Sequence, residues 1–180
     1  MMFLQNKIVK LRALEPNDID ILYKWENNPD IWEVSYTLVP YSKYALAKYI
    51  AEESLKDIYE SRQLRLVIEN IETKKPVGLI DLFEFEPHDM RASVGISIND
   101  KNDRGKKFAQ NALGLLIEYS FKHLHLNQLF VRIHNDNIPS INLFKGQNFE
   151  QCGLLKKWHL TSDGWKDEIQ FQLINPEIIN

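Results

Sequence analysis

Hydrophobic and polar positions follow several different periods along the chain, and each period predicts one kind of element. Residues 8–13 alternate apolar and polar side chains, which is typical of a half-buried strand. Residues 15–18 offer helix-start chemistry, and residues 19–26 then place apolar side chains at helical spacing. A second helix is predicted over residues 42–61, where apolar residues again recur on one face.

The rest of the chain combines strand patterns with two helical patterns. The predicted elements are strands over residues 64–68, 76–85 and 91–98, a long helix starting near 105, a strand over 129–133, a short helix over 140–147 and two strands flanking the turn 162–164. The whole order predicts an α+β fold, in which one mostly antiparallel sheet of about seven strands is flanked by about four helices. Because no linker or repeat interrupts the chain, we expect one domain over residues 1–180.

Composition and charge exclude several classes of partner. The 22 basic and 25 acidic residues give a formal net charge of −3, so nothing favours binding to nucleic acid or to an anionic membrane. No apolar run approaches the roughly 20 residues that span a bilayer, and residues 1–10 lack a signal-like apolar stretch. The single cysteine, Cys152, is expected to be a small buried residue. We therefore expect a cytoplasmic protein.

The segment from Ile96 to Ala112 carries the most specific chemistry, because a strand, a glycine-containing turn and a helix start follow one another there. The first turn of a helix has free N–H groups and a positive dipole end, which together bind anions such as a pyrophosphate. Gly105 lets the backbone approach a ligand, and the residues beside it add positive charge. The alternative is a solvated basic helix start beside an acidic loop.

Two motifs in this half of the chain resemble those of the GNAT superfamily of N-acetyltransferases. Arg104-Gly-Lys-Lys-Phe-Ala109 resembles the acyl-CoA signature (Gln/Arg)-x-x-Gly-x-(Gly/Ala), and Asn137 to Phe149 resembles the Asn-x-x-(Ala/Ser)-x-x-(Leu/Ile)-Tyr-x-x-x-Gly-Phe element. Further segments are similar to the ribosomal-protein alanine and spermidine N-acetyltransferase branches: residues 11–18, 25–32, 149–153 and 162–167. The likeness covers nearly the whole chain in the correct order.

The resemblance implies a GNAT-like fold and an enzyme that moves an acetyl group from acetyl-CoA to a primary amine. That amine would belong to a small molecule, a polyamine, or a protein or peptide, and would attack directly in a ternary complex. The implied state is a monomer or a homo-oligomer, with a dimer possible. By the same resemblance, the pantetheine would be bound by backbone groups of Ser97, Ile98 and Asn99. The pyrophosphate would be held by Arg104, Gly105, Lys106, Lys107, Phe108, Ala109 and Gln110. The CoA arm would be bordered by Asn137, Ser140, Phe144 and Lys145.

Three residues depart from the family pattern. Lys107 stands where the signature prefers glycine, and we expect a helical φ that suits lysine, with weakened rather than abolished binding. Phe144 stands where many members have a tyrosine that protonates the leaving thiolate, so that role must pass to water or another group. Asn148 replaces the glycine before Phe149, and asparagine tolerates a positive φ better than most residues.

The acceptor amine must lose a proton before it attacks a thioester. With a pKa of about 10.4, reaching the neutral form at pH 7 costs about 4.6 kcal/mol, and a carboxylate near the amine can take the proton. Strand alternation places Asp81, Phe83 and Phe85 on one face and Leu82, Glu84 and Glu86 on the other. We predict Glu84 as the catalytic carboxylate and Asp81 as the second candidate; alternatively, both face water at a strand end.

The acceptor itself is not determined by these residues. The acidic pair of the spermidine enzymes falls near Leu38–Val39 here, and one of their later glutamates is replaced by Val94. A polyamine needs several anions, and this chain supplies fewer. Trp32 and Tyr36, together with Glu84, are predicted to line the acceptor pocket, although core or rim packing is an equal alternative for the two aromatic residues.

Two rival functions remain open, and no metal is expected. A non-catalytic acyl-CoA-binding module is the first rival, because Lys107 and Phe144 depart from the pattern. A nucleotide-binding protein is the second, although the chain lacks a GxxxxGK(S/T) loop. His88 and Asp89 are adjacent possible ligands, but no further ligand follows at a suitable spacing.

Overall fold

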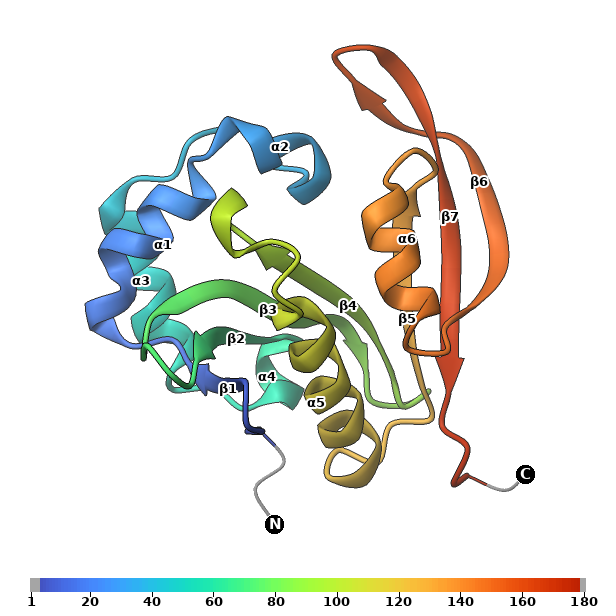
Figure 1. The fold of residues 1–180 in the computed structure, drawn as a ribbon, viewed down its shortest axis with the longest axis horizontal. Helices are drawn as coiled ribbons and strands as arrows, with labels where there is room; N and C mark the ends of the chain where they lie inside the picture. Colours follow the sequence, from blue (N-terminus) through green and yellow to red (C-terminus); the bar gives the residue numbers. More distant parts are fainter. Residues whose placement is uncertain (1–3, 179–180) are drawn as a thin grey trace.

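The computed structural model describes residues 4–178, and one seven-stranded sheet runs through them (Figure 1). The strands are β1 (Val9–Ala13), β2 (Leu64–Asn70), β3 (Pro76–Glu86), β4 (Arg91–Ile98), β5 (Gln128–His134), β6 (Glu150–Thr161) and β7 (Gly164–Ile174). They lie in the order β1-β2-β3-β4-β5-β7-β6. Within this sheet β4 and β5 form the parallel pair and the other pairs are antiparallel. The predicted α+β fold with a mostly antiparallel sheet is confirmed.

The helices of the described residues lie on both faces of the sheet. They are α1 (Ile19–Glu26), α2 (Pro29–Ser35), α3 (Lys43–Glu53), α4 (Ile58–Ser61), α5 (Phe108–Lys122) and α6 (Ile138–Lys145). Figure 1 shows α1, α2 and α3 gathered at one side of the molecule, away from α5 and α6. None of the helices in residues 4–178 is long and apolar enough to cross a membrane.

The sheet buries a separate apolar cluster on each face. Val67 and Ile68 are neighbours on β2, yet Val67 belongs to the cluster of Leu22 and Ile50 from α1 and α3. Ile68 belongs instead to the cluster that includes Leu116 of α5. Successive side chains of a strand point to opposite faces, and each fully buried apolar side chain stabilises the fold by about 1.5–3 kcal/mol. The two clusters therefore hold α1 and α3 on one face and α5 on the other.

A short helix that the pattern did not predict begins directly after α1. The Asn28 side chain accepts a hydrogen bond from the backbone N–H of Asp30 at 3.1 Å, and Pro29 occupies the first helical position of α2. Asparagine is a preferred N-cap and proline a preferred first residue of a helix. Residues 27–30 therefore both follow the end of α1 and begin α2.

The helix predicted over residues 42–61 is divided into α3 and α4. Asp57 caps the second helix, because its side chain accepts hydrogen bonds from the backbone N–H groups of Tyr59 and Glu60 at 2.8 and 3.0 Å. The Glu60 carboxylate in turn accepts from the Asp57 backbone N–H at 3.3 Å, which completes a capping box. A strong local cap of this kind restarts the helix and separates it from α3.

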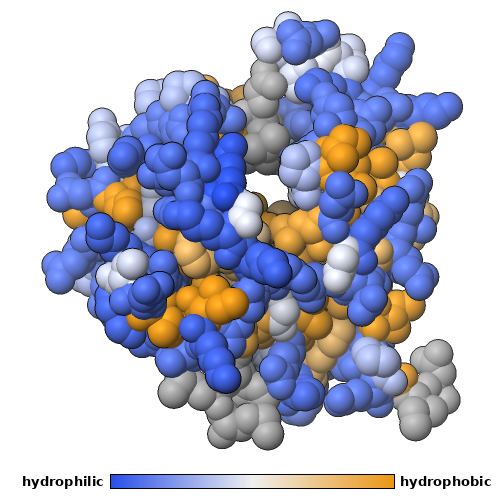
Figure 2. All heavy atoms as spheres, in the orientation of Figure 1, coloured by the Kyte–Doolittle hydropathy of each residue, from blue (hydrophilic) through white to orange (hydrophobic). Residues whose placement is uncertain are grey.

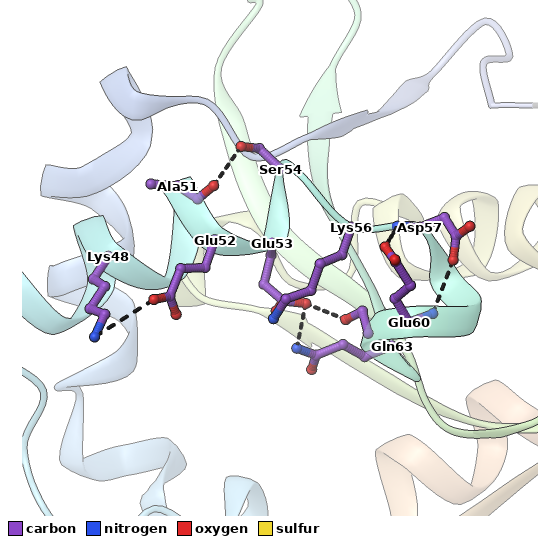
Figure 3. Close-up of polar contacts among 10 residues, drawn as sticks. Lys48, Ala51, Glu52, Glu53, Ser54, Lys56, Asp57, Glu60 and Gln63 are labelled. Carbon is purple, nitrogen blue, oxygen red and sulfur yellow. Dashed lines mark hydrogen bonds and ion pairs between the residues drawn. The ribbon is translucent and has the colours of Figure 1, made fainter.

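Glu53, the last residue of α3, connects the two helices and the strand that follows (Figure 3). Its carboxylate accepts hydrogen bonds from Lys56 Nζ at 2.8 Å and from Gln63 Nε2 at 2.9 Å. Burial opposes ionisation, but the hydrogen bonds from Lys56 and its neighbours outweigh burial and lower the pKa of Glu53 to about 2. The carboxylate is therefore charged at neutral pH and holds this connection together.

The two parallel strands run side by side for only three residue pairs, Arg91–Ser93 with Gln128–Phe130. Beyond these pairs, β4 stays paired with β3 as far as Ile98, and β5 stays paired with β7 as far as His134. The facing edges of the two strands therefore separate. Backbone N–H and C=O groups need partners wherever they are buried, so from Val94 onward the free edge of β4 can bind an extended ligand.

The turn between β4 and α5 contradicts one expectation. The helix begins at Phe108 rather than near Gly105, and Lys107 before it has a φ of 65°. The helical φ expected for Lys107 is therefore wrong, because the chain enters α5 through a left-handed residue. Glycine adopts this conformation freely, whereas other L-residues lose about 1–2 kcal/mol. Asn148 also has a φ of 65°, so the positive φ allowed for it is confirmed.

A β-bulge in β3 changes the faces predicted for its side chains. The pairing of β3 with β4 shifts register between Phe83 and Glu86, and Glu84 has a left-handed φ of 48°. Phe85 is consequently buried in the same cluster as Leu82, so the predicted alternation, with these two residues on opposite faces, is wrong. A bulge re-aims the side chain of its extra residue, and here it turns Glu84 away from the core.

Cys152 is exposed on β6, so its expected burial is wrong. Its Sγ lies 3.5 Å from the backbone oxygen of Gln170 on β7. Because β6 is the outermost strand of the sheet, no further strand covers this residue along its free edge.

Replacing Lys107 by glycine is expected to raise the free energy of unfolding by about 0.5–1 kcal/mol relative to Lys107→Ala. Alanine retains the Cβ that disfavours the left-handed conformation, whereas glycine does not. Both variants remove the same charge, so their difference isolates the backbone effect. Chemical denaturation of the two variants measures it, and an alanine variant as stable as the glycine variant would contradict the left-handed assignment.

Candidate active site

A cavity of about 640 Å³ opens where β4 and β5 separate. Ile96 and Ser97 of β4 form one wall, residues 131–134 of β5 form another, and Ile31 and Ser35 of α2 lie across the opening. Figure 2 shows the surface hollowed between the side that carries α2 and the side that carries α6 and β6. A volume of this size is typical of a small-molecule or cofactor site.

Eight of the residues predicted for the site line this cavity. They are Tyr36, Asp81, Glu84, Ser97, Asn99, Asn137, Ser140 and Phe144. They come from the end of α2, from β3, from β4 and its end, and from α6 and its N-cap. The Asn137 side chain accepts a hydrogen bond from the backbone N–H of Ser140 at 3.3 Å, so α6 begins at the cavity wall. Tertiary structure thus joins segments about 100 residues apart.

The other predicted residues do not line the cavity. Ile98 packs against the core, and Trp32 turns inward so that its Nε1 donates to the backbone oxygen of Glu26 at 3.0 Å. The Lys145 ammonium lies 5.9 Å from the ring centroid of a phenylalanine on β7. The segment Arg104–Gln110 follows β4, which lines the cavity, but none of its residues lines the cavity itself.

The start of α5 nevertheless presents free backbone donors. The first bond in the helix runs from the Asn111 N–H to the Lys107 oxygen at 3.1 Å, so the N–H groups of residues 108–110 have no acceptor within the helix. No side chain caps this helix start. Arg104 is tied back to the strand, because its Nε donates to the Ile98 oxygen at 3.3 Å. The positive end of the helix dipole adds to the attraction for an anion.

On the α1 side of the cavity, Arg65 holds two carboxylates. It donates to Glu26 at 2.8 Å and to Asp81 at 2.9 Å. Burial works against the charge of Arg65, but the charges of Asp81 and Glu26 outweigh it and raise the pKa of Arg65. Burial also raises the pKa of Glu26. Asp81 is therefore held by the guanidinium of Arg65 through both of its carboxylate oxygens.

Glu84 is the more accessible of the two predicted carboxylates. Its side chain is 50% exposed, against 20% for Asp81. It forms an ion pair with Arg132 of β5 across the cavity wall. The bulge in β3 produces this position, because it turns Glu84 away from the core and toward β5.

Sequence reasoning missed a second polar group beside the cavity. The Tyr36 hydroxyl donates a hydrogen bond to Glu168 of β7, and His134 Nε2 lies 3.5 Å from Glu168 Oε1. The imidazoles of His134 and His159 are stacked, with their centroids 4.8 Å apart. Burial first, and then the hydrogen bond to Glu168, raise the pKa of Tyr36. Burial and the charge of His159 lower the pKa of His134, so His134 is neutral at pH 7.

These four residues lie on four separate elements, which is why no local spacing indicated them. The sequence did not indicate the burial of Glu168, because strand alternation places it on the face of Gln170 and Gln172 and not on the apolar face of Phe171. A buried charge in such a strand calls for partners from elsewhere in the fold.

Comparison with known proteins agrees with this architecture. The model of the family described as Acetyltransferase (GNAT) domain matches residues 9–150. An uncharacterized N-acetyltransferase, p20, of Bacillus licheniformis is 26% identical over 167 residues, with 93% of each chain covered. The spermidine N(1)-acetyltransferase of Vibrio cholerae is 28% identical over 159 residues, covering 88% of this chain and 85% of the relative. The crystal structure of the Vibrio cholerae spermidine N-acetyltransferase in complex with CoA and spermine has a TM-score of 0.84 at 24% identity, and covers 97% of this chain and 100% of that one.

The family match extends from β1 to the first residue of β6. It therefore includes β3, β4, α5 and α6, which supply the two motifs and most of the cavity wall. The likeness to the solved structure independently establishes the fold. The chain belongs to the GNAT acetyltransferase family and is an acetyl-CoA-dependent N-acetyltransferase.

Proposed function

We propose that acetyl-CoA lies along the free edge of β4, with its pyrophosphate at the start of α5 and its thioester between β4 and β5. The separation of the two strands after three pairs supports this placement most strongly. Ser97 and Asn99 then border the pantetheine on one side, and Ser140 and Phe144 border it on the other. The uncapped N–H groups at the start of α5 suit the two phosphates.

The acceptor amine attacks the thioester carbonyl directly in our proposal. The new C–N bond forms, the tetrahedral intermediate collapses, and the C–S bond breaks to release CoA. The proton of the amine passes to Glu84, either directly or through one water. Glu84 suits this role because it lines the cavity and its side chain is half exposed.

Phe144 does not supply the proton for the leaving thiolate. Its side chain is 1% exposed and meets Phe149 in an edge-to-face contact with centroids 5.0 Å apart. A phenyl ring has no proton to donate, so Phe144 serves as an apolar wall beside the CoA arm. We propose that a water molecule in the cavity protonates the thiolate.

The charge of the cavity favours an acceptor with one ammonium group. Three carboxylates line it, those of Glu26, Asp81 and Glu84, and two guanidinium groups, those of Arg65 and Arg132, pair with them. One net negative charge remains. A polyamine carries several ammonium groups and needs more anions than this. We propose a monoamine or a peptide N-terminus as the acceptor, with the polyamine of the spermidine enzymes as the rival.

A thiol-release assay with acetyl-CoA and a panel of monoamines, amino acids, N-terminal peptides, aminoglycosides and polyamines tests this proposal. We expect at least one monoamine or peptide to give a kcat/KM about tenfold above that of spermidine, because the cavity retains one net negative charge. Spermidine as the preferred substrate would overturn the acceptor proposal and leave the acetyl transfer intact.

Substitution Glu84→Gln is expected to lower kcat about 100-fold, because the amide cannot accept the amine proton. The Kd for acetyl-CoA should stay within about twofold of the wild-type value, since Glu84 lies on the acceptor side. Glu86→Gln, two residues along β3 and outside the lining of the cavity, is the matched control and should leave both parameters unchanged.

The acceptor panel tests the non-catalytic alternative, and the Glu84→Gln variant tests the identity of the base. If tight acetyl-CoA binding is found while no acceptor in the panel releases thiol, the chain is a binding module. If Glu84→Gln turns over like the wild-type protein, another group takes the proton.

Reversing the charge at the start of α5 tests the pyrophosphate position. Lys107→Glu is expected to weaken acetyl-CoA binding about 3- to 30-fold, because a reversal counts the ~0.3–1 kcal/mol of one charge placement twice. Lys122→Glu, at the other end of α5, makes the same change in net charge and should have little effect. Calorimetric Kd values for S-acetylpantetheine, which lacks the phosphates, should be equal for both variants; a parallel loss there would contradict the proposed position.

A further inference from the structure

A cluster of ligand-type side chains lies outside the edge assigned to acetyl-CoA. His134 ends β5, His159 lies on β6 and Glu168 lies on β7. One nitrogen or oxygen atom from each residue lies within 4.8 Å of the others. Three neighbouring strands therefore converge on one point, which neither the family motifs nor the proposed acetyl transfer explains.

The charge of this cluster is poorly balanced by its protein partners. Glu168 is completely buried, and its Oε1 accepts the hydrogen bond of Tyr36 and faces His134. Within the described residues, Glu168 Oε2 and His134 Nε2 are buried and have no hydrogen-bond partner. An isolated buried carboxylate is costly, and buried charges are paired or coordinate metals. Both atoms therefore lack a partner that a bound cation would supply.

We propose that His134, His159 and Glu168 form a binding site for one divalent transition-metal ion of the zinc class. Two imidazole nitrogens and one carboxylate oxygen make a donor set that Zn²⁺ accepts, with a fourth position left for water. Mg²⁺ and Ca²⁺ prefer sets made of oxygen atoms alone. The donor types therefore select the ion. The adjacent pair His88 and Asp89, considered from the sequence, takes no part in this cluster.

Metal binding requires a small rearrangement, and His159 is the residue that can make it. Ligand atoms at about 2.0–2.1 Å from Zn²⁺ in a tetrahedron lie about 3.3 Å from one another. In the structure, the ligand atoms of the three residues are separated by up to 4.8 Å. The two imidazole planes meet at only 29°, so one ring must turn before both nitrogens face the same ion. His134 is buried, whereas His159 is partly exposed and follows a register shift between β6 and β7.

The ion would connect the end of β5 to the β6–β7 hairpin beside the cavity. His134 lines that cavity, and its buried Nε2, which has no hydrogen-bond partner among the described residues, is available to bind a metal. Occupancy would also neutralise Glu168. Because an ion that binds only the folded protein stabilises it by mass action, thermal unfolding is a second way to detect the site.

Titration of the chelator-treated full chain with Co²⁺ is the direct test, because Co²⁺ in such a site has a visible d–d absorption band. We expect the band to saturate at one Co²⁺ per chain and to disappear when one equivalent of Zn²⁺ is added. Absence of the band, together with no change in Tm on adding Zn²⁺, would overturn the proposal. No acyl-CoA is present in this experiment, so its result is independent of the proposed function.

Three variants locate the ion. His159→Asn and Glu168→Gln should each weaken Zn²⁺ binding at least tenfold, whereas His88→Asn, an exposed histidine on the β3–β4 turn, should not. His159→Asn is the decisive variant, because this partly exposed position is expected to tolerate the change without unfolding, which circular dichroism checks. Wild-type affinity in His159→Asn would show that the metal binds elsewhere and would refute the site.

Discussion

The structure depends on the early separation of two parallel strands. β4 and β5 share three residue pairs and then diverge, while β4 continues beside β3 and β5 continues beside β7. Parallel neighbours also need a crossover, and α5 provides it by packing across β1 to β4. The sheet therefore has a gap between β4 and β5, and the facing edges of both strands are unpaired along it. The cavity lies at this gap, and α5 begins after the strand that forms one side of it.

Paired charges define the chemistry inside the gap. Arg65 neutralises Glu26 and Asp81 from the α1 side, and Arg132 meets Glu84 from β5. Such pairing offsets part of the cost of burying these carboxylates, and it leaves little surplus charge for a polycation. Glu84 stands apart because a bulge exposes it. Glu168 differs in the opposite way, since it is completely buried and its Oε1 meets the Tyr36 hydroxyl and the imidazole of His134.

Local chemistry decided more than periodicity did at several positions. The pattern of residues 42–61 is helical throughout, yet the Asp57 capping box restarts the helix there. Alternation along β3 was predicted without a break, but Glu84 adopts a left-handed conformation that shifts Phe85 to the other face. Lys107 was expected to be helical, but it is left-handed, a conformation that the glycine preferred by the family signature at this position adopts freely.

The sequence by itself determined the strands, the long helix, the mostly antiparallel sheet and the family, because periodicity and ordered motifs are local properties of the sequence. It also selected eight residues that the fold gathers at one cavity. Only the tertiary structure decided that β4 and β5 separate after three residue pairs and that Arg65 donates a hydrogen bond to Asp81. It also decided that Tyr36, His134, His159 and Glu168 lie together. The physical reason is that these contacts join side chains from separate elements, and their meeting depends on strand order and register, which no local spacing encodes.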